Sequence, residues 1–168
     1  MDCSHSARQT SLDVMEVSTK PVVFSHSNAK ALCEHPRNID DTQIKRAAET
    51  GGLVCVTGIG PFLGPDIETD TIIRHIDYMV EKIGVSHVGI GIDYSFDQDH
   101  SDLPAGEDPA LWWPKVQGVD FDFSTVRFVS PERLPDIAAG LLRHGYKDAD
   151  VIAIMGGNFM RVAEACWR

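Results

Sequence analysis

Three short apolar segments constrain the fold of this chain most strongly. They are Pro21–Phe24, Leu53–Val56 and Val88–Ile92, and none shows the regular polar alternation of a strand with one face in water. Such runs are typical of parallel strands that are covered on both faces. Their ends, near residues 26, 57 and 93, are separated by roughly 31 to 36 residues, which is the length of a βα repeat. We therefore expect a parallel sheet in an α/β fold.

Helical patterns lie between and after these predicted strands. Gly51 and Gly84 stand at natural helix ends, and Ser130-Pro131 is a typical helix start. A Gly156-Gly157 pair breaks the last helical stretch. The predicted helices are Thr10–Val17, Asp40–Thr50, Asp70–Ile83, a helix that restarts at Pro135 and runs to Arg143, Asp148–Met155 and Asn158–Trp167.

We expect a single domain over residues 1–168, with strands and candidate ligands in 1–96, a long loop in 97–129 and C-terminal helices in 130–168. The loop is rich in Asp, Pro, Gly and aromatic residues, including Trp112 and Trp113. A long loop after a strand is where barrel enzymes place substrate-covering elements, but a plain surface insertion is an equal alternative. His100, within it, is a weak candidate for a substrate contact.

The number of βα units limits the architecture. About three and a half units fit this chain, whereas a closed eight-unit barrel needs on the order of 250 residues. The alternatives are an open α/β domain and one half of a barrel. His5 stands four residues after the start, with no room for a strand before it, and this favours the half barrel.

Composition excludes some partners and compartments. The net charge is -10, which argues against nucleic acid and anionic membrane surfaces as partners. The four cysteines show no CxxC spacing, so we expect no disulfide framework, a reducing compartment and a cytoplasmic location. We find no apolar run long enough for a membrane span, and we expect neither a signal peptide nor a lipid-anchor tail.

Two histidines follow the ends of predicted neighbouring strands. His26 comes directly after Val22-Val23-Phe24-Ser25, and His5 precedes it by 21 residues. That spacing accommodates one helix and one short strand, so both imidazoles are expected at the carboxyl ends of adjacent strands. Neutral imidazoles that converge there are suitable zinc ligands. The alternative, that they are ordinary loop histidines with local hydrogen bonds, is favoured by spacing alone.

Asp93 and Arg37 are the other candidates. Asp93 ends the strand Val88–Ile92, where a carboxylate can bind metal or transfer a proton; an Asx turn that leaves the strand is the alternative. Arg37 lies on the loop after His26, and a guanidinium there can bind a peptide carboxylate with two hydrogen bonds. A solvated surface arginine is its alternative.

Together these residues resemble the membrane (renal) dipeptidase family, peptidase family M19, over essentially the whole chain. Each piece of the resemblance is weak, but the ordered set is specific. The set comprises Asp2-Cys3-Ser4-His5-Ser6, Pro21–Ala29, Arg37-Asn38 with Asp40-Asp41, His75-Ile76-Asp77-Tyr78, Val88–Asp93, Gly140–Tyr146 and Gly156–Val162.

The resemblance implies the C-terminal half of a partial (β/α) TIM-like barrel of the metal-dependent hydrolase type. Family members hold two zinc ions and hydrolyse dipeptides. By resemblance, His5 and His26 match ligands of the second zinc, Arg37 matches the residue that binds the substrate carboxylate, and Asp93 matches the proton shuttle. The His-x-Asp motif, the bridging Glu and a substrate-polarising His of the family have no counterpart here. The loop with Trp112 and Trp113 is also more elaborate, so the preferred dipeptide is open.

We therefore predict that the 168 residues alone bind zinc weakly and hydrolyse dipeptides slowly or not at all. One alternative is a non-catalytic binding or structural module. Another arrangement left open is a homodimer of half-barrels, because a half-barrel exposes unpaired strand edges.

Overall fold

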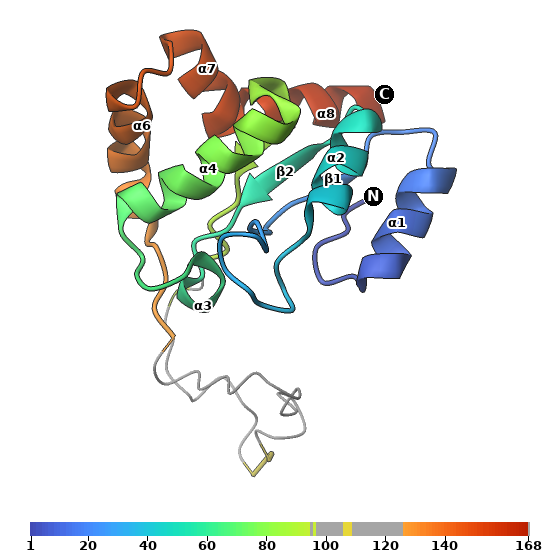
Figure 1. The fold of residues 1–168 in the computed structure, drawn as a ribbon, viewed down its shortest axis with the longest axis horizontal. Helices are drawn as coiled ribbons and strands as arrows, with labels where there is room; N and C mark the ends of the chain where they lie inside the picture. The colour runs from blue at the N-terminus through green and yellow to red at the C-terminus, as the bar shows by residue number, and fades with distance from the viewer. Residues whose placement is uncertain (95, 97–105, 109–125, 168) are drawn as a thin grey trace.

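The computed structural model describes residues 1–94, 96, 106–108 and 126–167. Its centre is a three-stranded parallel sheet in the order β1-β2-β3, formed by β1 (Val23–Phe24), β2 (Leu53–Val56) and β3 (Val88–Ile90). A parallel bridge joins Asp2 to Val23 and continues the sheet beyond β1. Strands that are neighbours in sequence are thus neighbours in space, as the βα spacing predicts (Figure 1).

The outer strands are shorter than predicted. The prediction began the first strand at Pro21, but Pro21 has no N–H and the Val22 N–H bonds the Thr50 hydroxyl at 3.0 Å instead of a neighbouring strand. The prediction ended the third strand at Ile92, whereas β3 ends at Ile90. Backbone pairing continues irregularly there, because the Gly91 N–H donates to the Val56 carbonyl at 2.9 Å.

The helices of the first half begin close to their predicted positions. They are α1 (Arg8–Val17), α2 (Asp41–Glu49) and α4 (Thr69–Ile83), and a 3-10 turn, η1 (Val85–His87), leads into β3. Asp40 was predicted inside a helix but is the N-cap of α2. Its carboxylate accepts the Gln43 N–H, and the Gln43 side chain accepts the Asp40 N–H, which is a capping box. A short helix that we did not predict, α3 (Gly60–Leu63), follows β2.

The second half is helical as predicted; the last helix has the predicted bounds, and the two before it differ at one end each. A 3-10 turn, η3 (Pro131–Arg133), precedes α6 (Leu134–Arg143). Then come α7 (Asp148–Ile152), a π-helical turn η4 (Ala153–Gly157) and α8 (Asn158–Trp167). Gly156 has φ 153°, a conformation that favours glycine, so the predicted break is a kink at this residue.

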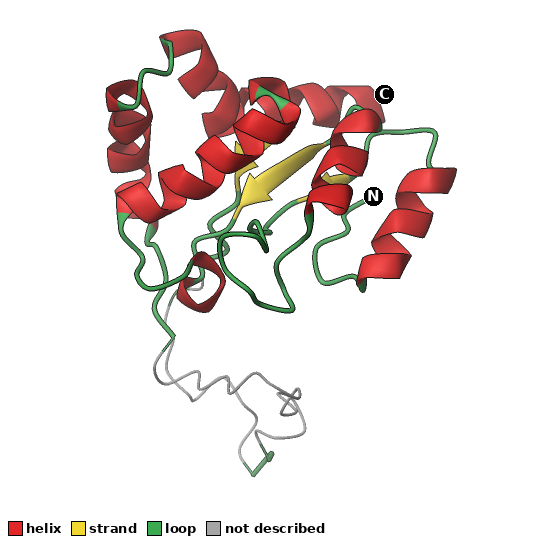
Figure 2. Ribbon diagram, in the orientation of Figure 1, coloured by secondary structure: helices red, strands yellow, loops and turns green. Residues whose placement is uncertain are grey.

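Different helices cover the two faces of β2. Val54 and Val56 lie in the main core with residues of α2 and α4, whereas Leu53 and Cys55 pack against Val162 of α8. Alternate strand residues point to opposite faces, so α2 and α4 lie on one face and α8 on the other (Figures 1 and 2). This double coverage explains the unalternated apolar runs in the sequence.

Polar contacts attach α8 to the beginnings of the strands. The Asn158 amide donates to the Val85 and Val88 carbonyls at 2.7 and 2.8 Å. The Arg161 guanidinium donates to the Gly51 and Ser86 carbonyls at 2.9 and 2.8 Å. The polar residues of α8 therefore satisfy backbone carbonyls next to the amino ends of β2 and β3.

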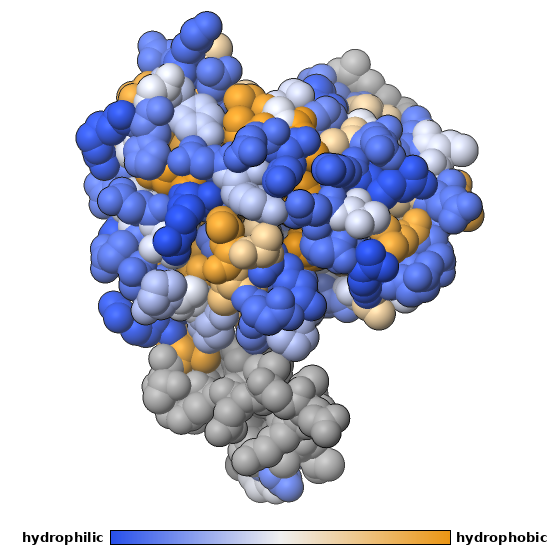
Figure 3. Space-filling model, viewed as in Figure 1, coloured by the Kyte–Doolittle hydropathy of each residue, from blue (hydrophilic) through white to orange (hydrophobic). Residues whose placement is uncertain are grey.

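The face seen in Figure 3 is mainly hydrophilic, with apolar side chains in patches among polar ones. Within the described ranges, no helix is both long enough and apolar enough to cross a bilayer. Most of the predicted loop, with His100, Trp112 and Trp113, lies outside the described residues. Its last part is described, and Phe128 forms an antiparallel bridge with Ile59.

Candidate functional site

His5, His26 and Asp93 lie together beyond the carboxyl ends of the strands. His26 follows β1, Asp93 follows β3, and His5 follows the residue that pairs with Val23. The imidazole ring centroids of His5 and His26 are 4.8 Å apart. His26 Nε2 lies 3.8 Å from Asp93 Oδ2. The sequence prediction that these groups converge at one edge of the sheet agrees with this geometry; their chemical roles remain predictions.

Two of these residues have an unusual backbone conformation. His5 has φ 64° and Asp93 has φ 53°, and they are the only described residues other than glycine with positive φ. Residues other than glycine adopt this region at a cost, and such residues cluster at functional sites. Here the left-handed conformation lies three residues after the strand in each case: His5 follows Asp2, which pairs with Val23, and Asp93 follows Ile90, the end of β3.

His26 offers an unused nitrogen. Its Nε2 is buried and has no hydrogen-bond partner among the described residues, while its Nδ1 lies 2.7 Å from Ser25 Oγ. A buried polar atom without a partner is unfavourable unless something fills the position. A buried ring nitrogen beside a second imidazole can serve as one ligand of a metal ion. Metal-bound histidines also form a hydrogen bond through their other ring nitrogen, as His26 does at Nδ1.

The carboxylate that supports these loops is Asp2, which was not among the predicted site residues. Asp2 accepts hydrogen bonds from the Ser25 hydroxyl, from the Ser25 N–H at 3.1 Å and from the Ser4 N–H at 3.0 Å. Ser4 Oγ in turn accepts the His26 N–H at 3.0 Å. Burial opposes ionisation of Asp2, but these hydrogen bonds outweigh it and hold its pKa below the ordinary value. The neighbouring residues in the Asp2-Cys3-Ser4-His5 motif were the available signal.

The electrostatic surroundings of His5 favour its neutral form. Burial lowers the pKa of His5, and the nearby charges of Arg37 and His26 lower it further, against the opposing effect of Asp93 and Asp2. A neutral imidazole is the form that binds metal.

Arg37 lies within electrostatic range of this group and is half-buried. Its guanidinium carbon lies 5.5 Å from the centre of the Phe62 ring, which also packs against the His35 ring at 4.6 Å. Burial lowers the pKa of Arg37, whereas Asp93 and Asp2 raise it. Arg37 is thus partly buried over Phe62, which lies on the unpredicted helix α3, and its role as a carboxylate-binding residue stays a prediction.

Buried polar groups join the loops under the site. The His75 ring is fully buried; its Nδ1 accepts the Ala29 N–H at 3.2 Å and its Nε2 lies 2.9 Å from the Leu63 carbonyl. The Asn28 amide donates to the Thr57 and Phe62 carbonyls at 3.2 and 3.1 Å. The sequence suggested no partner for His75, because both of its partners are backbone atoms from distant segments.

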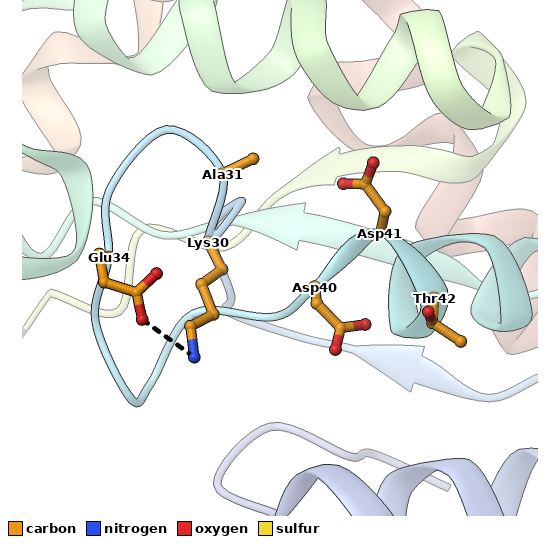
Figure 4. A pocket seen from close by; sticks show the side chains of 6 residues that line it. All are labelled: Lys30, Ala31, Glu34, Asp40, Asp41 and Thr42. Atoms are coloured by element: carbon orange, nitrogen blue, oxygen red, sulfur yellow. Dashed lines mark ion pairs between the residues drawn. The ribbon is translucent and has the colours of Figure 1, made fainter.

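An open pocket of about 390 Å³ lies beside the beginning of α2 (Figure 4). Its charged groups already have partners: Lys30 pairs with Glu34 at 3.1 Å, Asp40 pairs with Arg8, and Asp41 accepts the Tyr78 hydroxyl at 2.7 Å. None of the predicted site residues lines it. We therefore place the candidate site at the strand ends and not in this pocket.

Comparison with known proteins identifies the family. Residues 1–105 match the family model described as membrane dipeptidase (peptidase family M19). The chain belongs to the membrane dipeptidase family, peptidase family M19. It is 30% identical over 165 residues to dipeptidase tcpJ of Claviceps purpurea, and 31% identical over 166 residues to dipeptidase ataJ of Aspergillus terreus. Each match covers 96% of this chain but only 33% and 35% of the relative.

Solved structures show the same relationship for this M19 chain. An amidohydrolase from Pseudomonas aeruginosa superposes with a TM-score of 0.81 at 31% identity, covering 99% of this chain and 52% of that one. A metallo peptidase from Rhodobacter sphaeroides, solved with a phosphinate mimic of the dipeptide L-Ala-D-Ala, superposes with a TM-score of 0.72 at 26% identity and covers 99% and 42%. The chain thus spans about a third of its curated relatives and about half of these solved chains.

The metal-binding groups of this M19 chain are few. Within residues 1–94, 96, 106–108 and 126–167, no group of three or more His, Cys, Asp or Glu side chains is placed to hold one ion. Zinc sites have four ligands, of which at least three come from the protein. The His5–His26 pair is therefore suited to a metal but does not complete a site within the described residues.

Proposed function

We propose that this chain carries part of the active site of a zinc-dependent dipeptidase. The observation that carries the proposal is the buried Nε2 of His26, which has no hydrogen-bond partner among the described residues and lies 3.8 Å from Asp93 Oδ2. The His5 ring lies beside the His26 ring, and all three residues follow the carboxyl ends of parallel strands. Membership of the M19 family and the dipeptidase names of its relatives support it.

For the architecture, we propose the C-terminal half of a (β/α) barrel. The strands follow one another in sequence order, and the helices between them, α2 and α4, pack on the same face. A doubly wound sheet has a switch in strand order with helices on both faces, whereas a barrel keeps its crossover helices outside. On this proposal α8 packs near the amino ends of the strands, where Asn158 and Arg161 bond backbone carbonyls. Residues 1–168 then form one domain.

In the proposed site, His5 and His26 hold zinc through their neutral rings. Zinc bound there supplies Lewis-acid polarisation of the peptide carbonyl and lowers the pKa of a bound water. Two imidazoles hold zinc loosely, so we propose that the remaining ligands come from a part of the family barrel that this sequence does not contain.

Asp93 and Arg37 have separate proposed roles. Asp93, which lies 3.8 Å from His26 Nε2, accepts the proton of the attacking water and passes it to the leaving amine. Arg37 binds the terminal carboxylate of a dipeptide and so restricts the site to very short peptides. The Rhodobacter sphaeroides relative, solved with a dipeptide mimic, supports a dipeptide as the substrate class.

Zinc titration of the purified chain tests this proposal. Calorimetric titration should show weak binding that His5→Ala and His26→Ala abolish. His144→Ala should leave binding unchanged, because His144 lies on the surface and pairs with Asp77 at 3.2 Å. Dipeptide hydrolysis by the chain alone should be slow or undetectable. Zinc binding that survives His26→Ala would refute the assigned ligand, and hydrolysis at rates typical of enzymes would refute the incomplete site.

A second candidate function, a non-catalytic module, is favoured by the small number of metal-binding groups in the described residues. Sedimentation measured with and without zinc separates the alternatives. A zinc-dependent dimer would indicate that two copies complete one site, whereas a monomer without zinc affinity would favour the module.

A further inference from the structure

The Asp2 carboxylate lies in the strand position next to β1 and contacts both loops that carry the candidate ligands. One oxygen accepts the Ser4 and Ser25 N–H groups, and the other accepts the Ser25 hydroxyl. Ser4 immediately precedes His5, and Ser25 immediately precedes His26. A single side chain therefore sets the positions of the two loops relative to each other.

The direction of the hydrogen bonds from Asp2 to His26 follows from counting protons. An ionised carboxylate only accepts, so the close contact between Asp2 and Ser25 Oγ requires the single Ser25 hydroxyl proton. Ser25 Oγ then has no proton for His26 Nδ1, 2.7 Å away, and must accept one from it. His26 therefore carries its proton on Nδ1, which leaves the Nε2 lone pair free.

We infer that Asp2, acting through the Ser25 hydroxyl, is a positioning residue that selects the metal-binding tautomer of His26. The inference rests on the proposed metal site and adds the residues that prepare it. The free Nε2 is the atom that is buried without a hydrogen-bond partner among the described residues, and it lies 3.8 Å from Asp93 Oδ2. The tautomer of a metal-binding histidine is set by the hydrogen bond at its other nitrogen.

Replacing Asp2 by asparagine should reverse this chain of hydrogen bonds. If the introduced amide NH₂ takes the place of the oxygen that accepts from Ser25, it donates to Ser25 Oγ. The Ser25 proton is then free to point at His26 Nδ1, which must become the acceptor. His26 would carry its proton on Nε2, the nitrogen that zinc needs. Ser25→Ala should only remove the preference and give a mixture of tautomers.

Nitrogen-15 NMR of the histidine rings in the metal-free protein at neutral pH measures the tautomer directly. The wild type should show the proton on Nδ1 of His26, and Asp2→Asn should show it on Nε2. Ser25→Thr, which keeps a hydroxyl, should show the wild-type tautomer. Asp13→Asn is the matched control, because Asp13 is exposed on α1 and, among the described residues, its recorded hydrogen bond is the one from Gln9. Backbone amide spectra of each variant report whether it is folded.

Titration with Zn²⁺ alone gives the second readout. Loss of the hydrogen-bond partner behind a metal-bound histidine lowers metal affinity by about 10- to 100-fold, so we expect Asp2→Asn and Ser25→Ala to bind zinc more weakly by this factor. The two proposals fail separately. If the tautomer reverses in Asp2→Asn but the wild type binds no zinc, the inference stands and the metal site is wrong. If folded Asp2→Asn keeps the wild-type tautomer, the inference is overturned even where zinc binds.

Discussion

Gly91→Ala tests whether the close approach of the strand ends holds the site together. A Cβ at Gly91 would lie 1.9 Å from the Ser25 carbonyl oxygen and 3.2 Å from Cys55 Cβ. Ordinary van der Waals contact begins near 3.4 Å, so the first contact is too close by about 1.5 Å. The obstructing atom belongs to the backbone, which cannot rotate away as a side chain does.

The cost should exceed that of ordinary overpacking. Extra methylenes in packed interiors cost about 1 to 3 kcal/mol, and a clash with backbone places Gly91→Ala at about 3 kcal/mol or more. With a urea m-value of about 2 kcal/mol/M, the unfolding midpoint should fall by about 1.5 M. Because Ser25 bonds His26, zinc affinity should fall as well.

Gly52→Ala is the matched control at the opposite end of the strands. Its Cβ would lie 1.7 Å from the Val22 carbonyl oxygen, so its effect on the unfolding midpoint should be similar. Gly52 lies at the beginning of β2, so Gly52→Ala protein that remains folded should bind zinc as the wild type does. A Gly91→Ala protein with a wild-type urea midpoint would refute the steric argument, and equal loss of zinc affinity in the two variants would refute its link to the site.

Two further variants test the loops and the α1–α2 contact. His75→Leu leaves the Ala29 N–H and the Leu63 carbonyl buried without their partner. At about 1 to 3 kcal/mol for each of the two unsatisfied groups, we expect the free energy of unfolding in urea to fall by about 2 to 6 kcal/mol. A loss below about 1 kcal/mol would contradict this role. Burial acts to raise the pKa of Asp40, but hydrogen bonds from Arg8 and the backbone of α2 outweigh it and lower the pKa below 3.8. The stability that the ionised Asp40 contributes is present above pH 3.8 and is lost as the pH falls through the lower pKa of the folded state. Asp40→Asn should therefore weaken the dependence of the urea midpoint on acid pH. An unchanged dependence would exclude a contribution of Asp40 to stability.

The positions of the elements were predictable because local patterns encode them. Apolar runs marked all three strands, and Gly51 and Gly84 marked helix ends. The first residue of β1, Val23, and the last residue of β3, Ile90, were not predictable. The Val22 N–H bonds the Thr50 hydroxyl, so regular pairing of β1 begins only at Val23. Beyond Ile90, the Gly91 N–H still bonds the Val56 carbonyl, but the regular strand has ended. The capping role of Asp40 was legible in principle, since Gln43 stands three residues later.

The sequence by itself determined which residue types follow the predicted strands: two histidines and one aspartate after the strand ends, and one arginine on the loop after His26. Only the tertiary structure decided that the His5 and His26 rings meet, that Arg37 packs over Phe62, and that Asp2 bonds both ligand loops. The physical reason is range: periodicity and capping act over a few residues, whereas these contacts join segments 21 to 25 residues apart. Such contacts depend on the pairing of strands that lie far apart in the sequence, which a pattern of a few residues does not report.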